Sequence, residues 1–194
     1  RFPVQYVVRP QSLEHHDFRG YAGRVAGGIF RAGDEVLVLP SGFQSRIKEL
    51  FVGDAKVEEA FAPMSVTMTL ADEIDISRGD IIAKPNNHPL AEQDLDVMVC
   101  WMNQRPTSVN AKFLVRHTTK EVKAVIKEIQ YKLDINSLQR IENADQLLMN
   151  DIARIRIRTA QALQFDSYRK NRITGSLILV DEGSNETVAA GMII

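Results

Sequence analysis

The sequence has little of several features that would assign a protein to a class. It contains one cysteine, Cys100, so no disulfide can form within the 194 residues, and a reducing compartment, the cytoplasm, is expected. No apolar run approaches the roughly 20 residues that span a bilayer, so a membrane partner is not expected. The formal net charge is only -1, so no overall field favours nucleic acid or an anionic membrane surface.

The sequence also lacks the short motifs of common catalytic and nucleotide-binding sites. It contains no GxxxxGK[ST] phosphate loop, no Rossmann glycine fingerprint, no GxSxG elbow and no paired cysteines for a metal. Carboxylate pairs such as Glu58-Glu59 stand in polar stretches, where nothing marks them as an acid and a base. His15 and His16 are adjacent, but no third ligand follows at a suitable spacing, which favours a solvated loop over a metal site. We therefore predict no catalytic, cofactor-binding or metal-binding residue in this chain.

What the sequence does contain is a succession of short β-strand patterns. The stretch from Asp17 to Pro40 predicts a strand, a glycine turn at Gly27-Gly28 and a second strand over 35–39, which together make a hairpin. Glycines here permit positive φ and close backbone approach, so the chain can reverse and curl. A sheet of this kind tends to close into a small barrel.

Further strands are predicted by period-two alternation along the rest of the chain. The stretch 43–51 is expected to direct its odd-numbered residues, Phe43 and Glu49 among them, to one face. The segment 121–133 fits either a helix or a strand, and its β-branched residues favour the strand. Residues 143–150 are expected to form a short helical turn. The other predicted strands, of which the last two form a closing hairpin, are 3–8, 66–70, 81–84, 95–102, 111–117, 151–159, 176–180 and 187–194.

One short segment is the best candidate for a domain boundary. Residues 85–89, PNNHP, contain two prolines and two asparagines, which interrupt helix and sheet alike. We therefore predict two domains, residues 1–88 and 89–194, in an all-β fold of two small closed β-barrels.

Three groups of side chains admit both a functional and a structural interpretation. Cys100 lies in an apolar run without a neighbouring base, which favours a core cysteine over a catalytic thiol. Three arginines between 154 and 158 share one face of a strand, where they either track phosphates or form a wet face balanced by acidic residues, the interpretation we favour. The loop 165–175 carries a second, modest basic cluster. The residues of these two clusters are Arg154, Arg156, Arg158, Tyr168, Arg169, Lys170 and Arg172.

Three stretches resemble the barrels of translation-factor-type GTPases. FRGYAGRVAGGIFRAGDEVLVLP, residues 18–40, is similar to the second-domain barrel, where a glycine-rich hairpin leads to a G-D-E-V strand. ADEIDISRGDIIAKP, residues 71–85, resembles the closing segment of that barrel, and TGSLILVDEGSNETVAAGMI, residues 174–193, the last hairpin of the third-domain barrel. The resemblance implies two closed barrels similar to domains II and III of elongation factor Tu.

Other segments resemble the large, GTP-binding subunit of bacterial sulfate adenylyltransferases, and this resemblance runs over essentially the whole chain. The segments are KPNNHP (84–89), VCWMNQRP (99–106), AKFLVRHTT (111–119), MNDIARIRIRT (149–159) and FDSYRKNRITGS (165–176).

This resemblance implies a protein in which a GTPase domain, holding GTP and Mg²⁺, precedes two non-catalytic barrels. Only the barrels are present here, and the start at Arg1-Phe2-Pro3 without an initiator methionine is interpreted as a piece cut from a longer protein. The implied partners are the chain's own N-terminal GTPase domain and a small catalytic subunit. Together they make adenylyl sulfate and pyrophosphate from ATP and sulfate in sulfate assimilation, driven by GTP hydrolysis. Some relatives carry an adenylylsulfate kinase domain after the last barrel, and that possibility stays open.

The resemblance also implies a surface that meets another domain or subunit. Two groups of residues in the superfamily-like stretches are expected to face the GTPase domain or the partner subunit, namely Arg19, Gly20, Arg24, Arg78, Gly79 and Asp80. Alternatively, these glycines only shape turns. A different function, barrels of a translation factor that bind aminoacyl-tRNA, is kept open by the two basic clusters. The near-neutral charge and the sulfate-adenylyltransferase-like segments oppose it, so nucleic acid is not expected as a partner.

Overall fold

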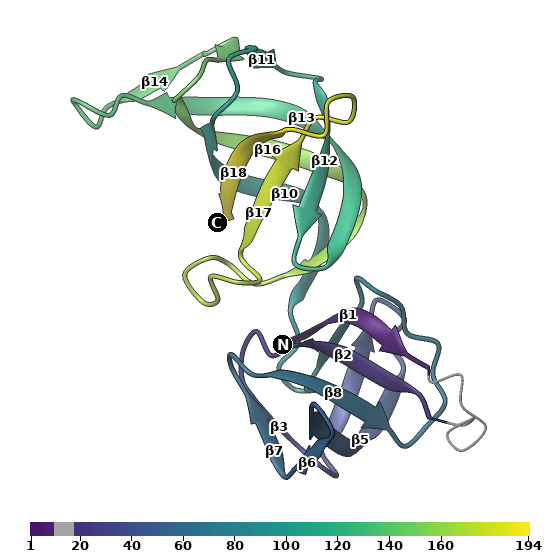
Figure 1. The fold of residues 1–194 in the computed structure, drawn as a ribbon. Helices are drawn as coiled ribbons and strands as arrows, with labels where there is room; N and C mark the ends of the chain where they lie inside the picture. Colours follow the sequence, from purple (N-terminus) through teal and green to yellow (C-terminus); the bar gives the residue numbers. More distant parts are fainter. Residues whose placement is uncertain (10–17) are drawn as a thin grey trace. The chain divides into compact units, whose positions relative to one another are not determined.

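A computed structural model describes residues 1–9 and 18–194, so His15 and His16 lie outside the described residues. The chain divides into two compact units, Arg1–Pro89 and Leu90–Ile194. Each unit is built from antiparallel strands, and no helix occurs in the described residues (Figure 1). The all-β prediction is therefore confirmed.

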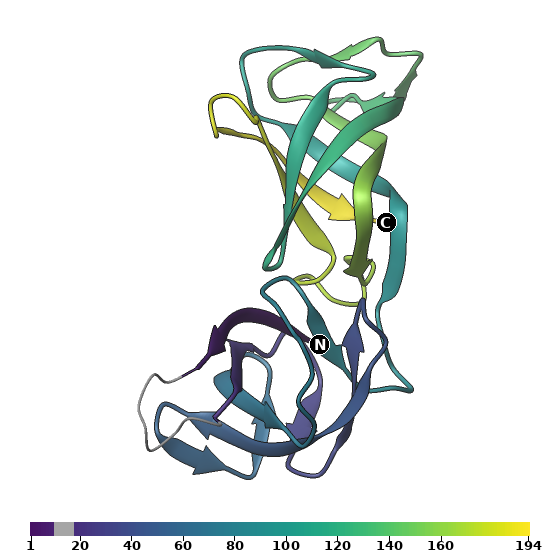
Figure 2. The same ribbon diagram turned by 90° about the vertical axis from the view of Figure 1, so that its right-hand side faces the viewer.

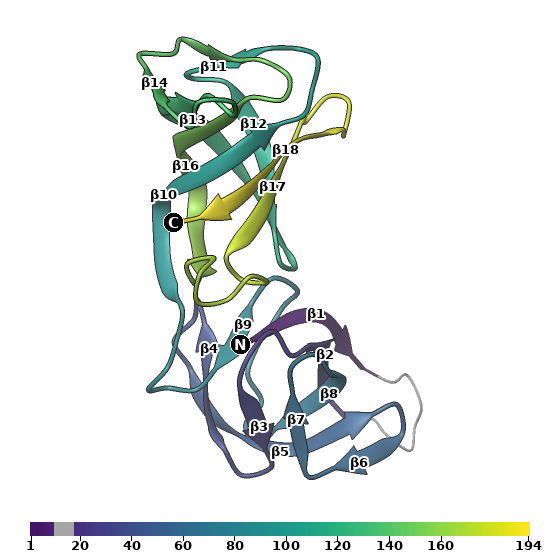
Figure 3. The ribbon, with the colours of Figure 1, turned by 90° about the vertical axis from the view of Figure 1, so that its left-hand side faces the viewer.

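The strands of the first unit close into a barrel. Their order around the sheet is β4-β9-β1-β2-β8-β5, and β5 pairs back with β4, so the ring has no free edge at that point (Figure 3). β6 extends the sheet beyond β5, and β3 pairs with β7 in a separate ribbon. The strands are β1 (Phe2–Val8), β2 (Gly20–Arg24), β3 (Ile29–Arg31), β4 (Glu35–Leu39), β5 (Gln44–Val52), β6 (Ala55–Val57), β7 (Glu59–Phe61), β8 (Ser65–Leu70) and β9 (Ile81–Ala83).

The second unit closes in the same manner with longer strands. The ring runs β12-β17-β18-β10-β16-β13 and returns to β12, and β14 extends it beyond β13 (Figures 1 and 2). β11 pairs with β15 outside the ring. The strands are β10 (Leu90–Trp101), β11 (Thr107–Ser108), β12 (Lys112–His117), β13 (Lys120–Leu133), β14 (Arg140–Glu142), β15 (Gln146–Leu147), β16 (Ile152–Phe165), β17 (Ser176–Val180) and β18 (Thr187–Ile193).

Each barrel is filled by the inward-facing side chains of its own strands. In β16, Ala153, Ile155 and Ile157 are buried while the residues between them point outward, as the period of two requires. Trp101 is buried at the end of β10 and meets Phe113 edge to face, with ring centroids 5.6 Å apart. The ambiguous segment 121–133 is a strand, β13, so the preference for a strand over a helix is confirmed.

The predicted glycine hairpin is wrong, although its strands exist. β2 lies between β1 and β8, and β4 lies between β9 and β5, so neither has an edge left for the other. Gly28 and Gly33 do adopt positive φ, at 81° and 86°. The turns at these glycines connect successive strands, but β2 and β4 do not pair with each other.

Two further predictions are corrected by non-local pairing. In β5, the register against β8 shifts between Ile47 and Glu49, so Leu50 enters the core while Phe43 and Glu49 do not. Residues 143–150 form no helical turn, because Gln146–Leu147 pairs with Thr107–Ser108 as a strand.

The described residues, 1–9 and 18–194, include no helix with the length and apolar character needed to traverse a bilayer.

Candidate functional site

The described residues hold no obvious metal centre. Nowhere among residues 1–9 and 18–194 do three or more histidine, cysteine, aspartate or glutamate side chains gather closely enough to bind an ion. His117, a buried titratable group, is engaged structurally: its Nε2 lies 2.8 Å from the carbonyl oxygen of Thr174. The candidate sites are therefore surfaces.

The first group of predicted interface residues lies on and beside β2. Nη2 of Arg19 lies 2.9 Å from Oδ1 of Asp75 and is largely covered, whereas Asp75 is 89% exposed. Gly20 is tightly enclosed, because a Cβ there would lie 2.6 Å from Cγ2 of Thr67. Arg24, at the far end of β2, is exposed and donates from Nε to the carbonyl of Pro63 at 3.2 Å. Gly20 thus has a packing role, and Arg24 presents an exposed charge.

The second group, Arg78-Gly79-Asp80, forms a turn against β1. Gly79 adopts a φ of 97°, and its N–H donates to the carbonyl of Val4 at 3.0 Å. The Asp80 carboxylate accepts from the N–H of Ser77 at 2.8 Å, and Nη1 of Arg78 donates to the carbonyl of Gln5 at 3.0 Å. The tripeptide therefore shapes a turn that is fastened to β1.

The two groups lie on opposite sides of one strand. β1 pairs with β2 through Val4 opposite Gly23, while the turn before β9 bonds to Val4 and Gln5 from the other side. Arg19 is at the end of β2 remote from this point. The six residues therefore do not converge on a single spot.

A small cleft of about 250 Å³ opens beside Arg19. Tyr21 lines it, and its hydroxyl donates to the carbonyl of Ile74 at 2.8 Å. Burial raises the pKa of Tyr21, so this phenol stays protonated and structural.

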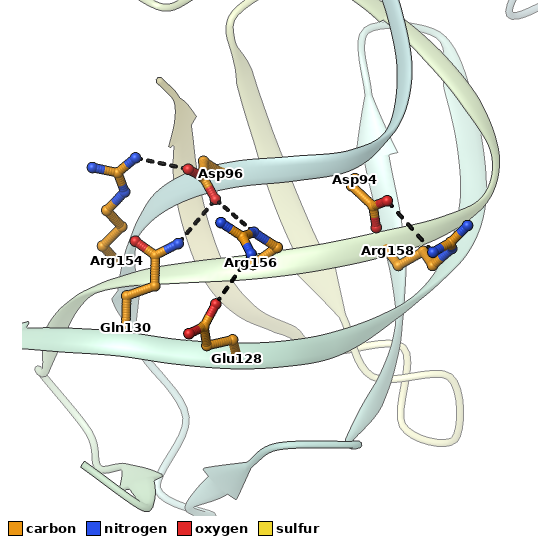
Figure 4. A network of polar contacts seen from close by, with 7 residues as sticks. All are labelled: Asp94, Asp96, Glu128, Gln130, Arg154, Arg156 and Arg158. Atoms are coloured by element: carbon orange, nitrogen blue, oxygen red, sulfur yellow. Dashed lines mark hydrogen bonds and ion pairs between the residues drawn. The ribbon is translucent and has the colours of Figure 1, made fainter. Parts of the chain in front are cut away.

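On the second unit, the arginine row of β16 is neutralised by acidic neighbours (Figure 4). Asp96 lies between two of them: Nη2 of Arg154 is 2.7 Å from Oδ2, and Nε of Arg156 is 3.2 Å from Oδ1. Partial burial alone raises the pKa of Asp96, but hydrogen bonds from the two arginines outweigh it and hold that pKa below its usual range.

The pairing extends along the row. Gln130 donates to Oδ1 of Asp96 at 3.1 Å, and Arg156 also pairs with Glu128 at 3.4 Å. Arg158 pairs with Asp94 at 3.5 Å. The row is a solvated strand face balanced by acids, so the structural interpretation is confirmed over phosphate tracking.

One surface feature of the second unit was not identified from the sequence. A groove of about 720 Å³ runs over the outer face of the second unit, between its strands and the loop 166–175; we call it the outer groove. Cys100 lines it and is half-buried, so the prediction of a core cysteine is wrong. The residues that line the outer groove are Met98, Val99, Cys100, Arg116, Thr118, Ile152, Tyr168, Arg172, Ile173, Ser176, Leu177, Ile178, Ala190, Gly191 and Met192.

The loop 166–175 that forms one wall is firmly attached to the barrel. The N–H of Tyr168 donates to the carbonyl of Ile193 at 2.8 Å, and the N–H of Ile193 donates to the carbonyl of Gly175 at 2.7 Å. Burial lowers the pKa of His117, which lies beneath the loop, so it is neutral at pH 7. The apolar residues on the outward face of β10 were a signal for the outer groove in the sequence. Only the pairing of β10 with β16 and β18 brings them together with the apolar residues of those strands.

Comparison with known proteins gives a consistent result. Residues 94–194 match the family model described as GTP-eEF1A C-terminal domain-like. The whole chain is 48% identical to 32% of the "Bifunctional enzyme CysN/CysC" of Mycobacterium tuberculosis (strain H37Rv). It is 45% identical to "Sulfate adenylyltransferase subunit 1" of Bacteroides fragilis (strain YCH46), again over the whole chain and 40% of that protein.

Solved structures show the same fold. The crystal structure of sup35 complexed with GDP superposes on 100% of this chain and 46% of that one, with a TM-score of 0.88 and 13% sequence identity. This likeness confirms the expected pair of closed barrels of the elongation-factor type. The chain spans less than half the length of the curated relatives that it matches.

Proposed function

The chain belongs to the GTP-eEF1A C-terminal domain-like family, and on that premise we propose that it is the two-barrel region of the GTP-binding large subunit of a sulfate adenylyltransferase. The observation that carries the proposal is the 45–48% identity, along the whole chain, to proteins named for that enzyme. The likeness to sup35 concerns the fold alone, because its sequence identity is 13%.

In this proposal the whole protein works with a small catalytic subunit. The pair forms adenylyl sulfate and pyrophosphate from ATP and sulfate: a sulfate oxygen bonds to the α-phosphorus and pyrophosphate leaves. GTP hydrolysis in a GTPase domain outside these 194 residues drives this unfavourable step, and GTP and Mg²⁺ bind there. The cytoplasm, where ATP and GTP are available, is the proposed compartment.

The two barrels act as a scaffold and couple the GTPase domain to the catalytic subunit. We assign residues 1–88 to a domain II-like barrel and 89–194 to a domain III-like barrel. Switch loops that rearrange on GTP hydrolysis need a rigid body against which to move, and two closed barrels with buried cores are such bodies. The exposed Arg24 and the turn at Arg78–Asp80 are proposed to meet the GTPase domain or the partner subunit.

The test uses the full-length protein purified with what accompanies it at low and moderate salt. We expect a stoichiometric small protein that resists salt, and pyrophosphate release that requires ATP and sulfate and is stimulated by GTP. Absence of both the small protein and the sulfate-dependent release would overturn the proposal.

The same preparation tests the alternative of a translation factor that binds aminoacyl-tRNA. That function predicts co-purified tRNA whose amount falls steeply as salt rises. The ion pairing of Arg154, Arg156 and Arg158 weighs against it, because carboxylates already balance the charges of these guanidinium groups.

A further inference from the structure

We propose that the outer groove is the docking site for a protein segment that presents apolar side chains flanked by carboxylates. Resting on the proposed function, we assign that segment to the small catalytic subunit.

The outer face of the second unit changes from charged to apolar within single strands. Outward-facing residues of β10 are carboxylates at 94 and 96 but Met98 and Cys100 further on. In β16 they are arginines from 158 to 154 and then Ile152. A strand face that meets water is normally polar, so the apolar half needs a separate explanation.

The apolar residues form a continuous row across neighbouring strands. Cys100 stands opposite Ile152 on one side and Ala190 on the other, and Ala190 stands opposite Ile178. In the next row Met98 stands opposite Met192. Met192 is 41% exposed and Ile173, on the facing loop, is 42% exposed. These side chains therefore offer apolar contact area to a partner.

Charge next to the outer groove determines what kind of partner fits. Arg169, Lys170 and Arg172 lie exposed on the loop, and within the described chain their side chains form no ion pair or hydrogen bond. Arg172 lines the outer groove itself. By contrast, the arginines of β16 are paired with acids. A partner with carboxylates beside its apolar side chains complements this arrangement.

The loop that forms the wall is held in one conformation. Oγ1 of Thr174 donates to Oδ2 of Asp166 at 2.7 Å, and His117 bonds to the carbonyl of Thr174. The backbone of Gly175 approaches Tyr168 so closely that a Cβ would lie 2.4 Å from its Cα. Docking therefore requires little ordering of this loop, which favours binding.

Segments that resemble sulfate adenylyltransferases also meet at the outer groove. Four of the five segments that resemble sulfate adenylyltransferases contribute to its lining: 99–106, 111–119, 149–159 and 165–176. The floor comes from the hairpin of β17 and β18, which resembles the wider superfamily. A surface assembled from segments far apart in the chain, each of which resembles this one enzyme, fits a partner specific to that enzyme.

The test measures association of the full-length protein with the small subunit for two groove variants, Met192→Glu and Arg172→Glu. Each is expected to weaken binding by roughly tenfold or more, as loss of an apolar anchor or reversal of a facing charge does. The matched control for the first is Met102→Glu, because Met102 is also 41% exposed but lies outside the outer groove. Lys127→Glu, on the exposed face of β13, controls for the charge change.

A second measurement needs no variant. Alkylation of the Cys100 thiol, followed by mass spectrometry of its peptide, should slow when the small subunit is added, because Cys100 lines the outer groove. Normal binding by both groove variants together with unchanged alkylation of Cys100 would overturn the proposal. So would self-association that the groove variants abolish without the small subunit, because the occupant would then be a second copy.

The two proposals fail in distinguishable ways. If the wild-type pair releases pyrophosphate with sulfate and GTP but the groove variants bind as wild type, only the docking inference is wrong. If the wild-type protein neither binds a small subunit nor supports that release, the proposed function fails, and the assigned occupant of the outer groove fails with it.

Discussion

Asp96 and Met98 project from the same face of β10, two residues apart, and the outer surface of the second unit changes character between them. Asp96 is held by two arginines of β16, whereas Met98 lines the outer groove opposite Met192. One strand thus carries a solvated ionic network and an apolar surface side by side.

Asp96→Asn should destabilise the protein by about 1 kcal/mol, because it removes the negative charge that pairs with Arg154 and Arg156 at a partly buried site. The variant Asp94→Asn is the control, because that pair is about half exposed and should cost less than about 0.5 kcal/mol. Urea denaturation at pH 7 measures both. If both variants lost the same free energy of unfolding, Asp96 would not be the more important carboxylate of the arginine row.

The same carboxylate should contribute to acid sensitivity. The pKa of Asp96 is lowered in the folded state, so its stabilising effect is complete above the unfolded pKa of about 4 and is lost as pH falls through the folded value. Stability of the wild type should therefore drop more steeply below pH 4 than that of Asp96→Asn. Parallel curves for the two proteins would count against this assignment.

His117 should produce a separate dependence at higher pH. Burial lowers its pKa, while the Thr174 carbonyl and Asp166 act in the opposite direction and Lys120 lowers it further. The unfolded chain therefore binds a proton below about pH 6.5 that the folded chain does not. The free energy of unfolding consequently decreases as the pH is lowered below this value, by at most about 1.4 kcal/mol per pH unit. His117→Gln should flatten the slope between pH 7 and 5 in urea titrations. An unchanged slope would show that His117 is not responsible.

Gly175→Ala should be strongly destabilising, by about 2 kcal/mol or more, because the added Cβ meets the backbone of Tyr168. Gly183→Ala is the control, since its Cβ would meet only the Asp181 side chain at 3.4 Å. Thermal unfolding compares the two. Equal midpoints would contradict the tight closure of the loop 166–175.

Arg24→Glu in the full-length protein should reduce GTP-stimulated pyrophosphate release or subunit association if Arg24 faces the GTPase domain or the partner. The expected loss is several-fold, typical of charge reversal at an interface rim. Lys48→Glu, an exposed lysine on β5, serves as the control. Wild-type GTP stimulation and subunit association in Arg24→Glu would show that the interface assignment is wrong for this residue.

The sequence alone was sufficient to predict the strands whose pattern is local. The alternation of Ile155 and Ile157 with arginines determined which face of β16 is buried, because side chains alternate with a period of two whatever the partner. The β-branched residues of 121–133 favoured strand over helix, because branched side chains suit the pleated surface of a sheet. The balance of acidic and basic residues also indicated correctly that the arginine row is a wet face.

Only the tertiary structure decided which strands are neighbours. β2 and β4 are close in sequence but pair elsewhere, and a register shift in β5 moves Leu50 instead of Glu49 into the core. The outward direction of Cys100 and the outer groove follow from pairing between strands of distant sequence. Such pairing depends on closure of the whole barrel, where each strand must satisfy two partners at once, and no short stretch of sequence contains that condition.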